Sequence, residues 1–233
     1  MNDWFSDGAM AEFCTAPASA VVRKPGGIGH IEAASLPISA LTAWQGLFDR
    51  TRLQAGDRVL VHGGAGAVGC FVVQLAHVHG AHVVATASAA NAEFVKSLGA
   101  QEVIDYREQP FEKAAAGMDI VFDTVGGETL RRSWNVLKPG GRMVTIASGE
   151  EGATDERAKR AFMLVTPDRR QLAAVADLLK RGQVQTVVDT VVPLSRAPDA
   201  FAGKVPRRGR GKVVVAIEEA IRTGALQNGT LEE

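Results

Sequence analysis

The sequence predicts an α/β fold: a doubly wound, six-stranded parallel sheet with helices on both of its faces. Two observations predict it. From residue 58 to residue 181, short apolar segments with strand patterning alternate with segments of helical patterning. Turn signals such as Gly99 and Pro139-Gly140-Gly141 separate these segments. A sheet of this kind binds its ligand beside the carboxyl ends of its strands.

The elements follow one another at short intervals. Strands are expected at 59–61, 82–86, 102–106, 119–123, 142–147 and, with the weakest pattern, 161–165. Helices are expected at 67–76, 91–98, 111–116, 128–137 and 171–181, and two more from Ile31 and Leu41 on either side of Pro37. Residues 150–160 are expected to form a charged loop or helix. Near the chain ends, strands are expected at 9–16, 19–22, 186–192 and 212–217, and a short helix at 197–202.

Composition excludes several classes of function. The formal net charge is zero, so no general attraction to nucleic acid or to an anionic membrane is expected. No apolar run approaches the length of a membrane span. The two cysteines, Cys14 and Cys70, lie far apart and imply no disulfide framework. Together with an N-terminus that lacks signal-peptide patterning, they predict a cytoplasmic protein.

A glycine-rich turn follows the first strand of the series. It comprises Gly64, Ala65, Gly66, Ala67, Val68 and Gly69 and has the spacing G-x-G-x-x-G between a strand and a helix. In a dinucleotide site the first glycine permits the tight turn, the second admits a pyrophosphate, and the third lets helix and strand pack closely. The sequence therefore predicts a pyrophosphate site at the head of the helix. The alternative is a glycine-rich turn that binds nothing.

The end of the second strand bears on the choice of coenzyme. Sites specific for NAD usually carry an acid about 20 residues beyond the glycines, which binds the ribose 2′-hydroxyl. Residues 85–91 contain no acid but include Ser88 and Asn91, which can donate hydrogen bonds to a 2′-phosphate. This pattern favours NADP(H). Both residues are also common helix caps, and the two roles are compatible.

The loop after the fourth strand has small residues. Thr124, Val125 and Gly126 follow Asp123 there, and small side chains let a coenzyme ring pass close to the backbone. The loop is predicted to line the coenzyme, although Asp123 or Thr124 can also cap the following helix. None of the five histidines is spaced from Cys, Asp or Glu as metal ligands are, so no metal site is predicted. No side chain is a convincing general acid, and no catalytic residue is assigned.

Eight stretches, taken together, resemble the medium-chain dehydrogenase/reductase superfamily, on its zinc-independent quinone and enone reductase branch. They are 9–13, 36–44, 62–69, 103–106, 122–127, 137–142, 188–194 and 210–214. The resemblance implies a Rossmann domain at 41–182 and, at 1–40 and 183–217, the remnants of a GroES-like β substrate domain whose earlier part is missing. Residues 218–233 would be a tail. Zinc-dependent members have a cysteine ligand where this chain has Pro37-Ile38-Ser39, so both zinc sites are expected to be absent.

The same resemblance implies roles for the site residues. The turn 64–69 would hold the pyrophosphate; Ser88, Asn91 and Tyr106 would surround the adenine ribose and its 2′-phosphate; Thr42, Thr124, Val125 and Ala147 would line the nicotinamide. Many relatives carry Lys or Arg among positions 90–92, where this chain has Ala90, Asn91 and Ala92.

The implied activity is hydride transfer from NADPH to a quinone or an α,β-unsaturated carbonyl, by a protein that can form a homodimer. Two alternatives are a non-catalytic NADP(H)-binding fragment and a methyltransferase that uses S-adenosylmethionine. The lack of an acid at 86–88 argues against the methyltransferase.

Overall fold

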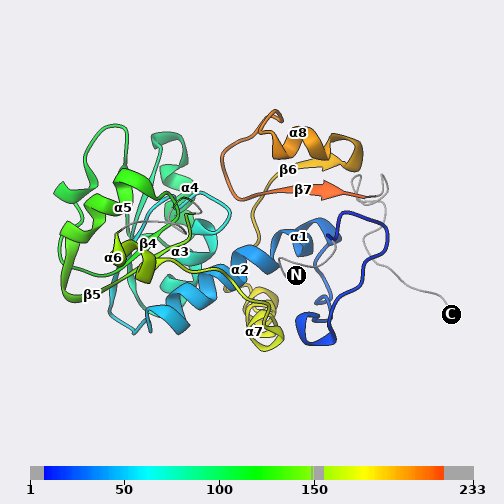
Figure 1. Ribbon diagram of the computed structural model, residues 1–233, viewed down its shortest axis with the longest axis horizontal. Coiled ribbons are helices and arrows are strands. Elements are labelled where there is room, and N and C mark those ends of the chain that lie inside the picture. Colours follow the sequence, from blue (N-terminus) through cyan, green and yellow to red (C-terminus); the bar gives the residue numbers. More distant parts are fainter. Residues whose placement is uncertain (1–7, 148, 150–154, 218–233) are drawn as a thin grey trace. The chain divides into compact units, whose positions relative to one another are not determined.

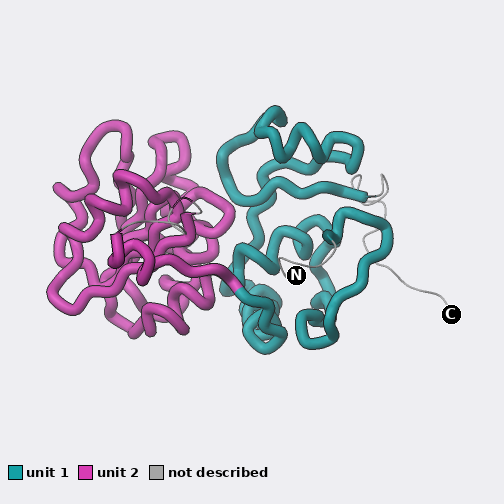
Figure 2. The backbone as a smooth tube through the Cα atoms, in the orientation of Figure 1, with its two compact units in different colours: residues 1–41, 166–233 teal, residues 42–165 magenta. Residues whose placement is uncertain are grey.

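The computed structural model describes residues 8–147, 149 and 155–217 (Figure 1). The chain divides into two compact units (Figure 2). Residues 42–165 form the first, here called the sheet unit, and residues 1–41 with 166–233 form the second. The predicted tail at 218–233 lies outside the described residues. Among the helices that are described, none is both long and apolar enough to span a bilayer.

The sheet unit is built on a five-stranded parallel sheet in the order β3-β2-β1-β4-β5. Its strands are β1 (Arg58–Val61), β2 (His82–Ala87), β3 (Glu102–Asp105), β4 (Met118–Asp123) and β5 (Leu137–Thr145). From β1 the order runs outward to β2 and β3 on one side and, through β4, to β5 on the other. Right-handed crossovers therefore place the helices of the two halves on opposite faces, with the switch in direction between β1 and β4. The parallel α/β sheet is confirmed.

A sixth strand is not formed. Of the predicted segment 161–165, Ala161 ends helix α6 (Glu156–Ala161), and Phe162 makes one isolated parallel bridge to Thr145. The Arg50 guanidinium donates hydrogen bonds to the carbonyls of Arg160 (2.7 Å) and Phe162 (3.2 Å). Because a side chain from a distant helix occupies these carbonyls, the segment does not extend the ladder, and the prediction of six strands was wrong.

The helices that connect the strands lie close to their predicted positions. They are α3 (Gly69–Val78), α4 (Ala92–Ser97), α5 (Gly127–Ser133) and the 3-10 helices η3 (Ala89–Asn91), η4 (Phe111–Lys113) and η5 (Trp134–Val136). Before them, α2 (Pro37–Trp44) continues into the π-helix η2 (Gln45–Arg50).

The helix predicted to reach residue 137 ends early, and β5 begins at Leu137 and includes Pro139-Gly140-Gly141. A register shift between Met118 and Ile120 accommodates this turn-like segment, in which Gly140 has φ +77°. Proline is tolerated there because β5 is an edge strand.

The second unit contains a two-stranded parallel sheet, β6 (Val188–Pro193) and β7 (Lys212–Ala216). Between the strands lie η7 (Leu194–Arg196) and α8 (Ala197–Phe201); α1 (His30–Ser35) and α7 (Arg169–Lys180) complete the unit. The strands predicted at 9–16 and 19–22 are not formed, and η1 (Ala18–Ala20) interrupts this region. Pro17 lies between them, and neither segment has a partner strand within the described part of the chain.

The buried carboxylate of Asp123 organises the loop between β4 and α5. It accepts hydrogen bonds from the N–H groups of Val125 (3.0 Å) and Gly126 (3.0 Å) and from the Thr145 hydroxyl (2.7 Å). Asp123 therefore holds the turn ahead of α5, as the alternative of a helix-entry turn predicted. This ties the loop to both β4 and β5. The prediction that Asp123 or Thr124 caps α5 was wrong, because its N-cap is Gly126 and no side chain makes a capping hydrogen bond there.

Asp123→Ala is expected to destabilise the sheet unit by about 3 kcal/mol, because it leaves two amides and a hydroxyl without an acceptor. Urea unfolding monitored by circular dichroism measures the change. Glu93→Ala, which removes an exposed carboxylate paired with Lys96, is the control and should stay within about 0.5 kcal/mol of the parent. Equal losses in the two variants would contradict this role of Asp123.

Candidate functional site

The glycine-rich turn lies between β1 and α3, beside the switch in strand order. The Gly64 N–H donates to the Thr86 carbonyl (3.0 Å), and the Gly66 N–H donates to the Gly63 carbonyl (2.9 Å). Helical hydrogen bonding begins where the Cys70 N–H donates to the Gly66 carbonyl (2.9 Å). The turn is therefore fixed to β2 at its start and to α3 at its end.

The three glycines of the motif are required for different reasons. A Cβ on Gly64 would lie 2.9 Å from the Ala85 Cβ, and one on Gly69 would lie 2.1 Å from the Gly63 carbonyl oxygen. Packing within the protein explains both. Among the residues that the structure describes, a Cβ on Gly66 would meet only that same oxygen, at 3.3 Å. No described side chain therefore closes this face of Gly66 to a ligand.

The head of α3 offers hydrogen-bond donors beside this open face. The N–H groups of Val68 and Gly69 donate to no acceptor among the residues that the structure describes. Unpaired amides and the positive end of the helix dipole together attract an anion. A pyrophosphate fits this cradle, because a side chain on Gly66 would occupy the space in which its oxygens would lie.

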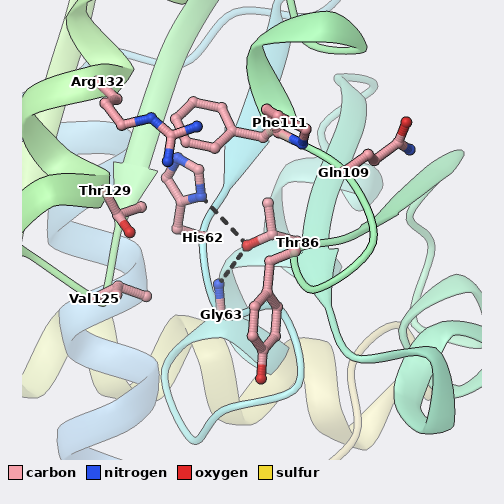
Figure 3. Close-up of a pocket in the computed structure, with 10 residues that line it drawn as sticks. His62, Gly63, Thr86, Gln109, Phe111, Val125, Thr129 and Arg132 are labelled. Carbon is pink, nitrogen blue, oxygen red and sulfur yellow. Dashed lines mark hydrogen bonds between the residues drawn. The ribbon is translucent and has the colours of Figure 1, made fainter.

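A pocket of about 420 Å³ opens next to the start of the turn (Figure 3). Its lining residues come from β1, β2, the segment after β3, and the β4–α5 region: His62, Gly63, Thr86, Tyr106, Gln109, Pro110, Phe111, Val125, Thr129 and Arg132. Of the residues predicted for the site, Tyr106 and Val125 line this pocket. Its rings and polar side-chain tips are typical of a site for a flat, polar small molecule.

Ser88 and Asn91 lie just beyond β2, at the starts of η3 and α4. Neither side chain makes a capping hydrogen bond, so the capping alternative is wrong for both side chains. The structure also brings an acid to this loop: the Asp105 carboxylate, at the end of β3, accepts the N–H groups of Ala89 (2.8 Å) and Arg107 (2.9 Å). The motif spacing did not indicate this acid, because Asp105 lies on the neighbouring strand β3.

Tyr106, which follows Asp105, is 57% exposed. The Arg107 guanidinium carbon lies 5.6 Å from the centroid of its ring. A cation therefore lies beside the phenol, although this chain has no basic residue at positions 90–92, where many relatives carry Lys or Arg.

The residues expected on the nicotinamide side lie on three elements. Thr42 is buried in α2, Ala147 follows β5 and donates its N–H to the Thr145 hydroxyl (3.3 Å), and Val125 is 55% exposed. The Thr124 hydroxyl donates to the His62 carbonyl (2.8 Å). Gly126 shapes the turn before α5, since its N–H donates a hydrogen bond to the Asp123 carboxylate and its φ is +77°.

Sequence reasoning gave His62 no functional role, yet it lies at the junction of β1 and the turn. Its ring is buried, with Nδ1 3.3 Å from the Thr86 hydroxyl and Nε2 2.9 Å from the Ser133 hydroxyl. Burial lowers its pKa to about 4; Asp123 and Glu112 partly oppose this shift, and Arg132 adds to it. Its position directly before Gly63 and Gly64, at the start of the glycine-rich turn, was the one available signal.

The pocket's arginine is already paired. The Arg132 guanidinium makes two hydrogen bonds to Glu112, from Nε (2.5 Å) and Nη2 (2.6 Å), and lies 5.1 Å from the centroid of the Phe111 ring. The hydrogen bonds lower the pKa of the Glu112 carboxyl and raise that of Arg132. This arginine therefore presents a neutralised, stacked plane to the pocket rather than a free positive charge.

Comparison with known proteins gives the family. A family profile described as "Zinc-binding dehydrogenase" matches residues 98–215. The chain is 35% identical to the chloroplast envelope quinone oxidoreductase homolog of Arabidopsis thaliana, covering 89% of this chain and 68% of the relative. The chain belongs to the medium-chain dehydrogenase/reductase superfamily. It lies on the quinone oxidoreductase and alkenal reductase-like branch, as its motifs predicted.

Two further matches agree with this assignment. The chain is 38% identical to the NADPH-dependent alkenal/one oxidoreductase, chloroplastic, of Arabidopsis thaliana, covering 89% of this chain and 53% of that relative. The solved structure of the quinone oxidoreductase from Coxiella burnetii superposes with a TM-score of 0.79 at 31% identity, covering 87% of this chain and 66% of that one. The chain thus spans between about half and about two thirds of the length of these proteins.

The lowered pKa of His62 predicts a pH dependence of stability. Because its folded pKa lies below the ordinary value of 6.5, the unfolded chain takes up a proton first, and stability present above pH 6.5 is lost as the pH falls toward 4. The loss attributable to His62 should reach about 2 kcal/mol by pH 4.5.

Urea unfolding of the parent and of His62→Gln between pH 4.5 and 7 gives the free energy of unfolding at each pH. The loss is the difference between the two proteins in the slope of this free energy against pH. His30→Gln, which replaces an exposed imidazole, should keep the slope of the parent. If the free energy of unfolding falls equally with pH in the parent and in His62→Gln, the lowered pKa of His62 is contradicted.

Proposed function

We propose that this protein binds NADP(H) and transfers a hydride, without zinc, to a quinone or an α,β-unsaturated carbonyl. The observation that carries the proposal lies within the described residues: no side chain covers Gly66, and the N–H groups of Val68 and Gly69 beside it have no acceptor. In a chain of this superfamily, such a cradle fits the pyrophosphate of a nicotinamide coenzyme. The neighbouring pocket then accepts the adenosine end.

The chain's own part in the reaction is to bind and orient. The turn holds the pyrophosphate, the pocket, whose wall includes Val125, holds the adenosine, and Thr42, Thr124 and Ala147 are the residues proposed to flank the nicotinamide. The coenzyme supplies the hydride when it is bound. A reduced quinone or an enolate can take its proton from water, so no general acid is required.

Sequence supports independence from zinc. Pro37, Ile38 and Ser39 occupy the region where zinc-dependent members place a cysteine ligand, and the chain contains two cysteines. Of these, Cys14 is exposed, and the buried Cys70 lies against the glycine turn, its thiol directed to the Ala65 carbonyl (3.2 Å).

The preference for NADP(H) rests on the loop after β2 and on its neighbour. Ser88 makes no side-chain capping hydrogen bond, and Arg107 supplies positive charge next to Tyr106. The Asp105 carboxylate opposes a 2′-phosphate, but its charge is partly offset by two backbone donors. We infer that Tyr106 and Arg107 together bind the phosphate.

A non-catalytic NADP(H)-binding protein is the second candidate, because the chain spans only part of the length of its relatives. The domain limits 1–40 with 183–217 and 41–182, the cytoplasmic location and the homodimer stay predictions. Titration with NADPH and NADH by fluorescence, followed on the same sample by NADPH oxidation with 9,10-phenanthrenequinone and with an alkenal, separates the candidates. Binding with turnover supports the reductase, and binding alone supports the second candidate.

Gly66→Val is expected to abolish measurable NADPH binding while the domain stays folded, since the side chain would fill the cradle and its Cβ would approach only the Gly63 carbonyl oxygen among the described residues. Fluorescence titration and thermal unfolding are the two measurements. Gly69→Ala is the variant expected to affect folding. Its Cβ would collide with the Gly63 carbonyl, so this variant should have a much lower unfolding temperature than the parent. Unchanged NADPH affinity in Gly66→Val would remove the pyrophosphate assignment.

Tyr106→Phe and Arg107→Gln are each expected to raise the Kd for NADPH by roughly tenfold and that for NADH by less than twofold, because only NADPH carries the 2′-phosphate. Isothermal titration with both coenzymes measures the ratio. Arg131→Gln, which removes an exposed arginine paired with Glu128, is the matched control. Equal losses for the two coenzymes would show that these residues do not contact the phosphate.

A further inference from the structure

A chain of hydrogen bonds crosses the interior of the sheet unit from α5 to the glycine turn. It begins at the Ser133 hydroxyl, which donates to the Thr129 carbonyl (2.6 Å) and lies 2.9 Å from His62 Nε2. On the other side of the ring, Nδ1 lies 3.3 Å from the Thr86 hydroxyl, which accepts the Gly63 N–H (3.1 Å). Figure 3 shows the last two links.

The chemistry of the hydroxyls fixes the direction of this chain. Ser133 has a single hydroxyl hydrogen, which it donates to the Thr129 carbonyl. Its oxygen can therefore only accept a hydrogen bond from the His62 ring. His62 therefore carries its hydrogen on Nε2, and the bare Nδ1 accepts from the Thr86 hydroxyl. Thr86 can then also accept from Gly63, and every donor along the chain has one acceptor.

The far end of the chain is the backbone on which the turn depends. Gly63 has φ +74°, and its carbonyl oxygen accepts a hydrogen bond from the Gly66 N–H. The same oxygen lies so close to Gly69 that a Cβ on Gly69 would be 2.1 Å from it. Thr86 holds this segment twice, by its hydroxyl at Gly63 and by its carbonyl at Gly64. A displacement of Gly63 would therefore move both Gly66 and the amides at the head of α3.

We propose that His62 is a positioning residue: its Nε2-protonated tautomer connects Ser133 to Thr86 and so holds the Gly63–Gly64 backbone in the conformation that forms the phosphate cradle. The inference concerns the turn itself, and its link to coenzyme affinity rests on the proposed function. His62 is not a catalytic residue, because its two nitrogens are occupied within the protein.

The surroundings of the ring favour one protonation state. Phe111 packs against it with ring centroids 4.6 Å apart, and the charged groups that act on it are Asp123 from β4, Glu112 from η4 and Arg132 from α5. Glu112 and Arg132 neutralise each other, and Asp123 is satisfied by its own donors. The tautomer is therefore expected to persist across the neutral pH range.

The first test uses the coenzyme-free protein. Nitrogen-15 NMR of the imidazole should place the hydrogen on Nε2 of His62 from pH 5.5 to 8. Amide hydrogen exchange should then show that Ser133→Ala speeds exchange at Gly63 by roughly tenfold, although Ser133 does not touch the turn. Thr86→Val should speed it at least as much, and Thr86→Ser, which restores the hydroxyl, should return it to the parent value.

Thr51→Val is the matched control. It removes another buried hydroxyl of the sheet unit, which donates to the Gly46 and Leu47 carbonyls and has no part in the chain to Gly63. It should lower the unfolding temperature without changing exchange at Gly63. If Ser133→Ala behaves like Thr51→Val, or if the His62 hydrogen lies on Nδ1, the inference is overturned.

The second test measures the NADPH Kd and the kinetics. Ser133→Ala should raise the Kd and the KM for NADPH about tenfold and change kcat less than twofold, because the turn and not the reacting atoms is disturbed. An unchanged Kd alongside faster Gly63 exchange would overturn the link to the cradle. A parent protein that binds neither NADPH nor NADH would overturn the proposed function, while the tautomer and exchange results would still decide the role of His62.

Discussion

The approach of helix α3 to the end of β1 is the constraint on which the rest of this structure depends. The backbone at Gly69 comes so close to the Gly63 carbonyl that a single added carbon would lie 2.1 Å from that oxygen. This contact sets where α3 begins. It also sets which N–H groups at the start of the helix have no acceptor among the described residues. Gly66 lies in sequence between the two tightly packed glycines, and among the described residues only the Gly63 carbonyl oxygen approaches the position of a Cβ there.

Buried polar groups secure that geometry from both sides. Thr86 binds the start of the turn from β2, and Asp123 binds the loop of the neighbouring strand β4. A buried donor without an acceptor costs far more than the bond itself contributes, so these residues favour one conformation strongly over others. A rigid backbone of this kind can present amides to a ligand without having to reorganise on binding.

The charges of the site are distributed unevenly. Arg132 is neutralised by Glu112 and stacks on Phe111, so this part of the pocket suits an uncharged ring. Arg107, beside Tyr106, pairs with no carboxylate among the described residues and lies where the proposed 2′-phosphate would be bound. This separation between a paired and an exposed arginine underlies the proposed preference for NADP(H).

Sequence by itself determined the parallel sheet, the glycine turn and most helix positions, because these depend on local patterns such as the apolar run of β1 and the spacing of Gly64, Gly66 and Gly69. Tertiary structure alone decided that Arg50 prevents a sixth strand, that Asp105 reaches the loop after β2, and that His62, Thr86 and Ser133 form one chain. The physical reason is the same in each case: the partners are far apart in sequence, and a hydrogen bond between them leaves no periodic trace in the chain.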